Sequence, residues 1–315
     1  MEIIRGQCNL KSRHQGCVAT IGNFDGIHEG HQQVIQQVNE KARELNVPSA
    51  LIMFEPQPRE FFAPNDVPAR LTRLREKLEV LQTLSIDRVL CLRFNARLAG
   101  LAAEQFVQQI LVDGLGIKYL VVGDDFKFGK DRKGDFAYLQ SAGEKSGFGV
   151  CNTQSYVHEG TRVSSTGIRE ALNKGDLQTA KIMLGRDFSM SGRVAHGDKR
   201  GRSIGFPTAN IYLHRKSSPV YGVYAVKLHS DDPRLIGEDF TGVANVGQRP
   251  TVDGTRTLLE VHLFNFDRQI YGAHVQVRFI EKIREEQRFD SLEALIAQIN
   301  VDADQAKAFF GIKEC

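Results

Sequence analysis

The chain has 315 residues, of which 41% are hydrophobic and 25% are charged, and its formal net charge is only +3. This length suits two domains, which can bury large cores without disulfides or metal staples. The small net charge gives no sign of a nucleic-acid partner, and the sequence has no run of about 18 apolar residues that would predict a membrane span.

The five cysteines are scattered, without a CxxC pair or a Cys/His cluster. This usage argues against a zinc site and favours a reducing compartment. The N-terminal residues 1–6 lack the apolar core of a signal peptide. We therefore expect a cytoplasmic protein.

Residues 1–185 alternate short apolar runs with longer amphipathic stretches, which is the pattern of βα units in a parallel sheet. In chain order, we expect strands at 17–22, 49–54, 88–92 and 119–122, and helices at 32–45, 71–84, 105–112 and 168–173. The pattern predicts an α/β domain.

The rhythm changes after residue 185, where short strand-like runs are divided by Gly and Pro with no long helix between them. These runs are 220–228, 242–246, 258–264 and 273–279. They predict an antiparallel sheet or barrel. Apolar periodicity at 291–299 and 303–310 predicts two closing helices. We expect domains at 1–185 and 186–315.

A glycine-rich segment follows the first strand and reads Gly22-Asn23-Phe24-Asp25-Gly26-Ile27-His28-Glu29-Gly30-His31. Open α/β sheets bind ligands at the carboxyl ends of their strands. Glycines let the backbone approach phosphate oxygens and adopt turns that other residues avoid. His28 and His31 share a side of the helix start, beside the positive end of the helix dipole. Two such imidazoles can stabilise charge on an α-phosphoryl group.

A bare HxGH tetrapeptide is more often a glycine turn with two surface histidines, but the strand–loop–helix context favours a site. The longer pattern Gly-x-Phe-Asp-Gly-x-His-x-Gly-His resembles the signature of the nucleotidyltransferase superfamily, whose histidines bind ATP or CTP phosphates. The resemblance implies catalytic roles for His28 and His31. It also implies nucleotide contacts for Gly22, Phe24 and Asp25.

The segment Ser164-Ser165-Thr166-Gly167-Ile168-Arg169 matches the SSTxxR element of the same superfamily. In that element, hydroxyls and backbone N–H groups at a helix start hold phosphate. The match implies that Ser164 and Ser165 bind the nucleotide and that Arg169 clamps the departing pyrophosphate through its planar fork. Alone, the segment would more often be a capped helix.

The segment 123–134 resembles a third element, found in the flavin-specific branch, in which Asn or Asp precedes Phe-x-Phe-Gly. A solvated charged loop is the alternative. The position after a strand and the paired aromatic residues favour a binding loop for flavin or adenine. We assign Asp125, Phe126 and Phe128 to flavin binding.

A second glycine-rich run of a different kind ends in Gly205-Phe206-Pro207-Thr208-Ala209-Asn210. It is no Walker A loop, because the Lys-Ser/Thr ending is absent. The Thr208 hydroxyl and the Asn210 carbonyl, two residues apart on an extended segment, point the same way and suit Mg²⁺ carrying ATP phosphates. A β-turn with a buried Thr/Asn pair would explain PTAN but not the whole run.

That run resembles the riboflavin kinase signature GxxxGRxxGFPTAN. The resemblance implies that Thr208 and Asn210 hold the metal, and that nucleotide contacts come from Gly197, Lys199, Gly201, Arg202, Gly205 and Asn210. The family's general base lies in a Glu-x-His strand and maps onto Glu260, which would take the proton of a primary hydroxyl. Alone, Glu260 would more often be an exposed partner for Lys or Arg. The family's flavin-side segment maps onto Arg284 and Phe289.

Together, both halves resemble the bacterial bifunctional riboflavin kinases/FAD synthetases. The resemblance implies a Rossmann-like nucleotidyltransferase domain followed by an antiparallel six-stranded barrel kinase domain with C-terminal helices. It implies phosphorylation of riboflavin to FMN with ATP and Mg²⁺, then adenylylation of FMN to FAD with release of pyrophosphate. We expect riboflavin, FMN and ATP as partners, and neither nucleic acid nor membrane. Weak self-association is left open.

Two alternatives stay open. In the first, the kinase is joined to a domain that transfers CMP or AMP to another phosphate compound, although the complete PTAN domain argues against such a pairing. In the second, the chain is a flavin-binding regulator or an RNA-binding protein. The intact catalytic set argues against that view, which would be favoured by tight flavin retention without turnover.

Overall fold

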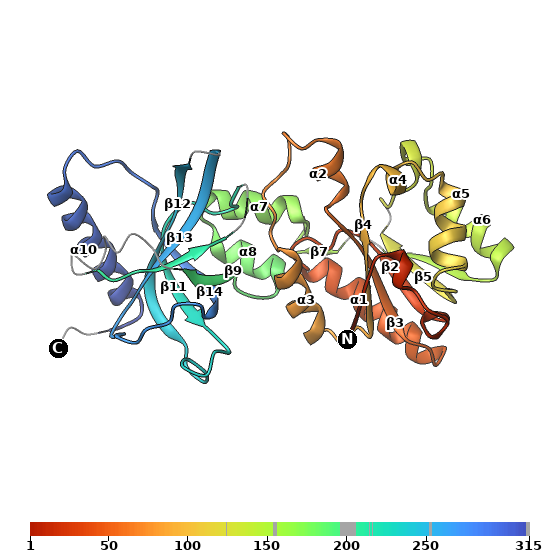
Figure 1. Ribbon diagram of the computed structural model, residues 1–315, viewed down its shortest axis with the longest axis horizontal. Coiled ribbons are helices and arrows are strands. Elements are labelled where there is room, and N and C mark those ends of the chain that lie inside the picture. Colours follow the sequence, from red (N-terminus) through yellow and green to blue (C-terminus); the bar gives the residue numbers. More distant parts are fainter. Residues whose placement is uncertain are drawn as a thin grey trace. The chain divides into compact units, whose positions relative to one another are not determined.

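The computed structural model describes residues 1–123, 125–153, 156–195, 206–213, 215, 217–251 and 254–312. The chain forms two compact units (Figure 1). The first consists of Met1–Pro68 with Thr72–Ser164, and the second of Ala69–Leu71 with Ser165–Cys315. By packing, residues 165–185 thus belong with the second unit. The expected division of function after residue 185 stays a prediction.

Within its described residues, the first unit contains a sheet of six parallel strands in the order β1-β4-β3-β2-β5-β6. The strands are β1 (Glu2–Arg5), β2 (Val18–Ile21), β3 (Ser49–Glu55), β4 (Arg88–Arg93), β5 (Tyr119–Gly123) and β6 (Gly149–Thr153). From β2 the chain runs outward to β3 and β4, and then returns to place β5 on the other side of β2. The topological switch point, where such sheets bind ligands, therefore lies between β2 and β5.

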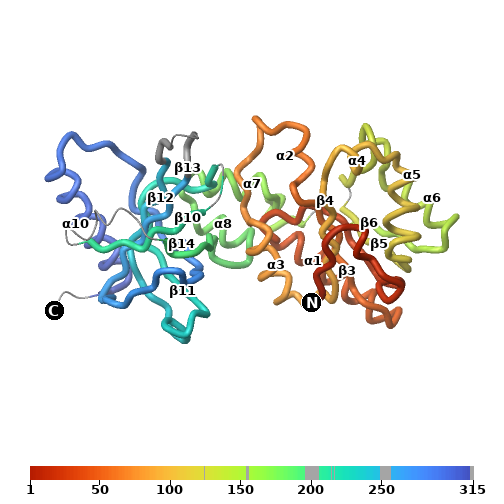
Figure 2. The backbone as a smooth tube through the Cα atoms, in the orientation of Figure 1, coloured from red at the N-terminus to blue at the C-terminus, as the bar shows by residue number. Residues whose placement is uncertain are grey.

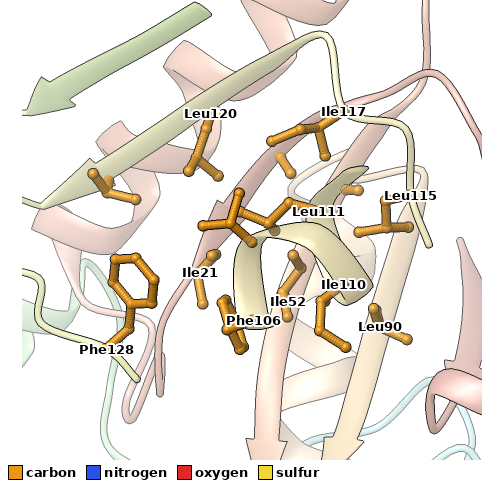
Figure 3. Close-up of a cluster of buried hydrophobic side chains, with 14 of the residues drawn as sticks. Ile21, Ile52, Leu90, Phe106, Ile110, Leu111, Leu115, Ile117, Leu120 and Phe128 are labelled. Atoms are coloured by element: carbon orange, nitrogen blue, oxygen red, sulfur yellow. The ribbon is translucent and has the colours of Figure 1, made fainter. Parts of the chain in front are cut away.

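Helices cover both faces of this sheet, and the strand side chains alternate between two cores. One core lies under α1 (Glu29–Glu44) and α3 (Leu74–Thr83). The other, shown in Figure 3, lies under α5 (Ala103–Phe106), the π-helical turn η3 (Val107–Val112) and α6 (Phe136–Ser146). Burial on both faces explains why these strands read as nearly continuous apolar runs. The predicted parallel α/β domain is confirmed.

The first unit also contains several shorter elements. They are η1 (Gln7–Asn9), η2 (Ser12–His14), α2 (Pro58–Phe62), α4 (Ala96–Ala99), η4 (Lys130–Arg132), and the hairpin of β7 (Val157–His158) and β8 (Thr161–Arg162). Two helices, α7 (Ser165–Lys174) and α8 (Leu177–Leu184), open the continuous part of the second unit.

The second unit is a closed antiparallel barrel with the strand order β10-β13-β12-β11-β14-β9 among its described residues. The strands are β9 (Ser189–Ala195), β10 (Ala209–Tyr212), β11 (Gly222–His229), β12 (Phe240–Thr251), β13 (Gly254–Leu263) and β14 (His274–Arg284). The fully buried Tyr224 meets Phe279 edge to face, with ring centroids 5.2 Å apart. Closure removes the free sheet edges. The predicted six-stranded barrel is confirmed.

The chain's last helix corrects one expectation. Instead of two closing helices, α10 runs continuously over Leu292–Phe309 (Figure 2). Asp302 interrupts the apolar pattern because its carboxylate is the buried partner of Arg284, so the interruption does not mark a helix end. Ala303 and Ala306 pack on the barrel wall.

Candidate active sites

Two of the segments singled out in the sequence lie at one edge of the sheet. Strands β2 and β5 are hydrogen-bonded neighbours. The loop after β2 carries the first glycine-rich segment, and the loop after β5 carries Asp125, Phe126 and Phe128. Since parallel strands end on the same side, both loops lie at the switch point.

His28 and His31 form a stacked pair at the start of α1. Their ring centroids are 3.6 Å apart and the planes differ by 16°. His28 is the N-cap of the helix, and its Nδ1 accepts the backbone N–H of His31 at 3.3 Å. An accepting Nδ1 puts the proton of the neutral His28 ring on Nε2, which makes that nitrogen a donor. The prediction that the two histidines share a side is confirmed.

The glycines of the loop serve two purposes. Gly26 has a φ of 86° and uses the left-handed region open to glycine. A Cβ on Gly22 would lie 3.0 Å from the Phe24 ring, and one on Gly30 would lie 3.3 Å from the His28 ring. The expectation that all three adopt special turns is therefore corrected, because Gly22 and Gly30 make room for rings instead.

The side chains of Phe24 and Asp25 are buried and support the loop. Their exposed fractions are 3% and 4%. The Phe24 ring centroid lies 4.9 Å from that of His31. Asp25 Oδ1 accepts the backbone N–H of Thr72 at 3.0 Å and the Thr72 hydroxyl at 3.3 Å. The predicted nucleotide contacts of Phe24 and Asp25 stay predictions, for which their backbone atoms are the better candidates.

The loop after β5 has a buried and an exposed part. Phe126 and Phe128 stack with centroids 5.5 Å apart, but Phe128 also packs on Phe106 in the core (Figure 3). Asp125 is exposed and pairs with Arg162 of β8 at 3.3 Å. Phe128 thus anchors the loop, while Asp125 and the partly buried Phe126 are accessible to a ligand.

An aromatic cluster that we did not predict lies on and around α2, which follows β3, the neighbour of β2 on the side away from β5. Phe54, Phe61, Phe62 and Phe94 have ring centroids between 5.3 and 5.7 Å apart. Phe62 is 66% exposed. Exposed rings at a ligand-binding edge can stack on a planar ligand. Two adjacent phenylalanines in a polar segment directly after a strand are the signal that could have found them.

The SSTxxR segment forms a helix start, as predicted, since α7 begins at Ser165 directly after Ser164. Arg169 lies one turn into this helix. Its Nε donates to the Ala69 carbonyl at 2.6 Å and its Nη1 to the Ser165 carbonyl at 3.0 Å. These bonds hold the guanidinium at the start of α7. Phosphate binding by Ser164, Ser165 and Arg169 stays a prediction.

In the barrel, the strand register aligns three polar residues. Glu260 of β13 lies directly opposite Asn210 of β10 on one side and Asn245 of β12 on the other. Directly opposed residues share one face of a sheet. Asn210 also donates to the Thr208 carbonyl at 3.4 Å. The structure therefore groups Glu260 with the predicted metal ligands and adds Asn245, which the sequence did not single out.

His262 lies two residues beyond Glu260 and faces the PTAN segment. Its Nδ1 lies 3.0 Å from the Pro207 carbonyl oxygen, and the Phe206 ring meets it edge to face at 5.1 Å. Burial lowers the pKa of His262. The neutral ring can donate from Nδ1 and so tie the segment before β10 to β13.

A cavity of about 180 Å³ opens beside Thr208. Pro207, Thr208 and Ala209 form one wall, Val261 and Leu263 of β13 another, and the turn 266–271 closes it. The lining combines aliphatic side chains with polar groups of the turn. Such a pocket suits a flat heteroaromatic ring.

Arg284 and Phe289, both predicted to contact flavin, lie together. The Arg284 guanidinium is 5.7 Å from the centroid of the Phe289 ring. Its Nε and Nη2 donate to both oxygens of Asp302, at 2.8 and 2.7 Å. That fork is therefore engaged within the protein, and the flavin contact stays a prediction. Nearby, the Glu286 carboxylate covers Gly247, and burial raises its pKa.

Several predicted nucleotide contacts cannot be placed, because they lie outside the described residues. These are Gly197, Lys199, Gly201, Arg202 and Gly205. In the part of the chain that is described, no group of three or more His, Cys, Asp and Glu side chains could hold a metal ion. The oxygen donors of Thr208 and Asn210 fit Mg²⁺, which takes few protein ligands and completes its shell with phosphates and water.

Among the described residues, no helix is both long enough and apolar enough to cross a membrane.

Comparison with known proteins identifies one family for each half of the chain. Residues 10–167 match the model of the FAD synthetase family, and residues 184–310 match that of the riboflavin kinase family. The bifunctional riboflavin kinase/FMN adenylyltransferase of Escherichia coli strain K12 is 51% identical over 314 residues, 99% of each chain. Its counterpart in Haemophilus influenzae is 50% identical over 310 residues, covering 98% of this chain and 99% of that one.

Among solved structures, that of a macrolide-efflux protein from Streptococcus pneumoniae superposes with a TM-score of 0.81 at 30% identity. The match covers 96% of this chain and 97% of that one. The two family models and the full-length identities agree with one another. The chain therefore belongs to the family of bifunctional riboflavin kinases/FMN adenylyltransferases.

Proposed function

We propose that the first unit adenylylates FMN at the β2/β5 switch point, and that the second unit phosphorylates riboflavin at the barrel wall around Glu260. Family membership supplies the two activities, and the geometry supports this assignment of residues. The observation that carries it is the stacked pair of His28 and His31 at the switch point, well separated in sequence from the aligned Asn210 and Glu260.

In the kinase reaction, the primary 5′-hydroxyl of riboflavin attacks the γ-phosphorus of ATP. A new O–P bond forms, the bond to the β-phosphate bridge breaks, and ADP leaves. Glu260 takes the hydroxyl proton, because an alcohol is a weak nucleophile without a base. Mg²⁺, when bound, neutralises phosphate charge. Thr208 and Asn210 would hold it beside Glu260.

The cavity beside Thr208 supports the same assignment. It adjoins the proposed phosphate and metal ligands, and its aliphatic walls with a polar turn suit the adenine ring of ATP. ATP bound in this way would have its triphosphate running along Thr208 towards Asn210. The hydroxyl of riboflavin would approach from the Glu260 side.

In the adenylyl transfer, a phosphate oxygen of FMN attacks the α-phosphorus of ATP, and pyrophosphate leaves. No base is required, because the FMN phosphate is already ionised near neutral pH. His28 and His31 donate hydrogen bonds to the charge that develops on the α-phosphoryl group. The family resemblance assigns the departing pyrophosphate to Ser164, Ser165 and Arg169. Catalysis is therefore positioning and electrostatics.

The exposed aromatic cluster supports a flavin position at this site. Phe62, in the helix that follows β3, offers a face on which the isoalloxazine ring can stack. Asp125 and Phe126 approach the same edge from the loop after β5. Together they would hold the flavin while its phosphate reaches His28.

The scattered cysteines support a cytoplasmic location, since Cys8, Cys17, Cys91 and Cys151 are free thiols. The same proposal has riboflavin, FMN and ATP as the ligands, with neither nucleic acid nor membrane as partner. Weak self-association stays open.

The test is a time course of purified protein with riboflavin, ATP and Mg²⁺, with the flavins separated by chromatography. FMN should rise first and FAD follow, and chelation of Mg²⁺ should stop both. His31→Ala should accumulate FMN without FAD, and loss of both activities in that variant would refute two separate sites. In the unaltered protein, FMN alone would mean that the first unit serves another acceptor. Tight flavin retention without turnover would favour a flavin-binding regulator.

A further inference from the structure

We propose that Thr72 and Lys77 are positioning residues of the adenylyltransferase site. They hold the loop 23–27 in the conformation that presents His28 and His31 to the nucleotide. The inference rests on the proposed assignment of that reaction to the β2/β5 switch point. Neither residue belongs to the glycine-rich signature, and both come from the segment that starts α3.

The loop has a backbone conformation that its sequence does not favour. Phe24 has a φ of 46° and Ile27 a φ of 42°, so two residues other than glycine lie in the left-handed region. Ile27 is β-branched and fully buried. Such a conformation is costly for residues other than glycine, and it persists only where the surrounding structure determines it. The conformation therefore has to be imposed by contacts from outside the loop.

Thr72 makes the first set of these contacts. Its hydroxyl accepts the backbone N–H of Gly26 at 2.9 Å and donates to Asp25 Oδ1 at 3.3 Å. Its own backbone N–H donates to the same Asp25 oxygen at 3.0 Å. Thr72 is 7% exposed and Asp25 is 4% exposed, so water cannot readily replace these bonds. One buried threonine thus fixes two consecutive loop residues.

Lys77 makes the second contact, on the other side of Phe24. Its Nζ donates to the Asn23 carbonyl, and the side chain has no exposed surface. A buried ammonium group is expensive to maintain, so its polar contacts must hold it strongly in place. The carbonyl that it fixes lies one residue after the Gly22 that follows β2. The loop is therefore held both before and after its first strained residue.

A displacement of the loop 23–27 would be passed on to the histidines along the backbone. Gly26 lies two residues before His28, whose ring stacks on His31 and caps α1. A shift of the loop by 1 Å would carry the His28 ring with it, and such a misplacement of a catalytic group costs about 10²-fold in rate. Thr72 and Lys77 influence the histidines through this loop, which makes them positioning residues.

The experiment compares Thr72→Val, which keeps the shape of the side chain and removes the hydroxyl, with Thr72→Ser, which keeps the hydroxyl. FAD formation from FMN and riboflavin phosphorylation are measured on the same full-length sample. Thr72→Val should lower kcat for FAD formation by about 10²-fold and change KM for ATP much less. Thr72→Ser should keep most of the activity. Riboflavin phosphorylation should be unchanged in both variants.

A double-mutant cycle separates positioning from a general effect on stability. His31→Gln keeps an N–H donor and hence residual activity. Because Thr72 acts through the loop that places the histidine pair, Thr72→Val should cost far less in the His31→Gln background than alone. Equal losses in both backgrounds, or equal losses for Thr72→Val and Thr72→Ser, would overturn the proposal.

If Thr72→Val does not fold, Lys77→Met removes the contact to Asn23 and is measured in the same cycle. Non-additivity with His31→Gln supports the proposal, and additive losses overturn it. The site assignment is tested separately by His31→Ala. Full FAD formation in that variant would overturn the assignment and, with it, the positioning role.

Discussion

The ion pair between Arg284 and Asp302 is predicted to fasten α10 to the barrel. The side chain of Asp302 is 5% exposed and that of Arg284 is 20% exposed. Both carboxylate oxygens accept from the guanidinium, and Gln298 donates to one of them at 2.9 Å. Asp302→Ala would remove all of these acceptors at once.

The expected loss follows from this burial. Removing one partner of a fully buried pair costs about 3–5 kcal/mol. Water reaches part of the Arg284 guanidinium and recovers part of that cost, so we expect about 2–3 kcal/mol. For a unit of this size, that loss lowers the melting temperature by about 5–10 °C.

The assay combines calorimetry of the full chain with hydrogen exchange of α10. Asp302→Ala should speed exchange along α10 and lower the melting temperature of the barrel unit. The matched control is Asp304→Ala on the same helix, which breaks an exposed pair with Lys307 and should change stability by less than about 0.5 kcal/mol. Equal effects of Asp302→Ala and Asp304→Ala would refute the reasoning.

The double replacement Arg284→Met with Asp302→Leu extends this test to the flavin. Apolar side chains can substitute for a buried ion pair, so the pair of changes should recover most of the lost stability. If riboflavin phosphorylation recovers as well, Arg284 serves the barrel and not the flavin. If stability returns without activity, the predicted flavin contact of Arg284 is supported.

The remaining predictions concern the two sites. Glu260→Ala should lower riboflavin phosphorylation by about 10²–10⁴-fold and leave FMN adenylylation intact; unchanged kinase turnover would remove Glu260 from the base role. Gly30→Ala places a Cβ 3.3 Å from the His28 ring, so FAD formation should fall by about tenfold while phosphorylation persists, and equal losses in both would point to misfolding. Burial lowers the pKa of His262 in the folded protein. The neutral ring therefore contributes fully to stability at pH values above 6.5, the pKa of an unperturbed histidine in the unfolded chain. That contribution is lost as the pH falls from 6.5 through the pKa of the folded state. His262→Gln should flatten that fall in melting temperature, and an unaltered profile would contradict the assignment.

The central strands could be predicted from the sequence because both faces of the parallel sheet are buried. β3 is buried along its length except for its last residue, so it reads as a continuous apolar run. The edge strands β1 and β6 escaped prediction, because half-exposed residues such as those of β6 carry no such signal. α1 begins at Glu29, earlier than expected, because its polar first turn is set by the His28 cap rather than by apolar periodicity.

The sites were predictable where a motif is local and not where a contact is distant. The signature located His28 and His31, but Thr72 lies 46 residues from Gly26 in the chain. Asn245 becomes part of the second site only through the register of β12 on β13. No local sequence pattern predicts either contact. They depend on the helix and strand packing that the whole fold decides.

The nucleophile of each reaction explains which charged groups the sites contain. A hydroxyl needs a base, and in the barrel the half-buried Glu260 lies between Asn210 and Asn245 on neighbouring strands. A phosphate needs none, and a free carboxylate beside it would repel it. The first signature contains two carboxylates. Asp25 is buried and accepts two hydrogen bonds from Thr72, and Glu29 lies in the first turn of α1, where a negative charge favours the helix start. The imidazoles of His28 and His31 lie at the start of α1. The second site therefore has a carboxylate that can accept a proton, and the first site has imidazoles that can donate hydrogen bonds to phosphate.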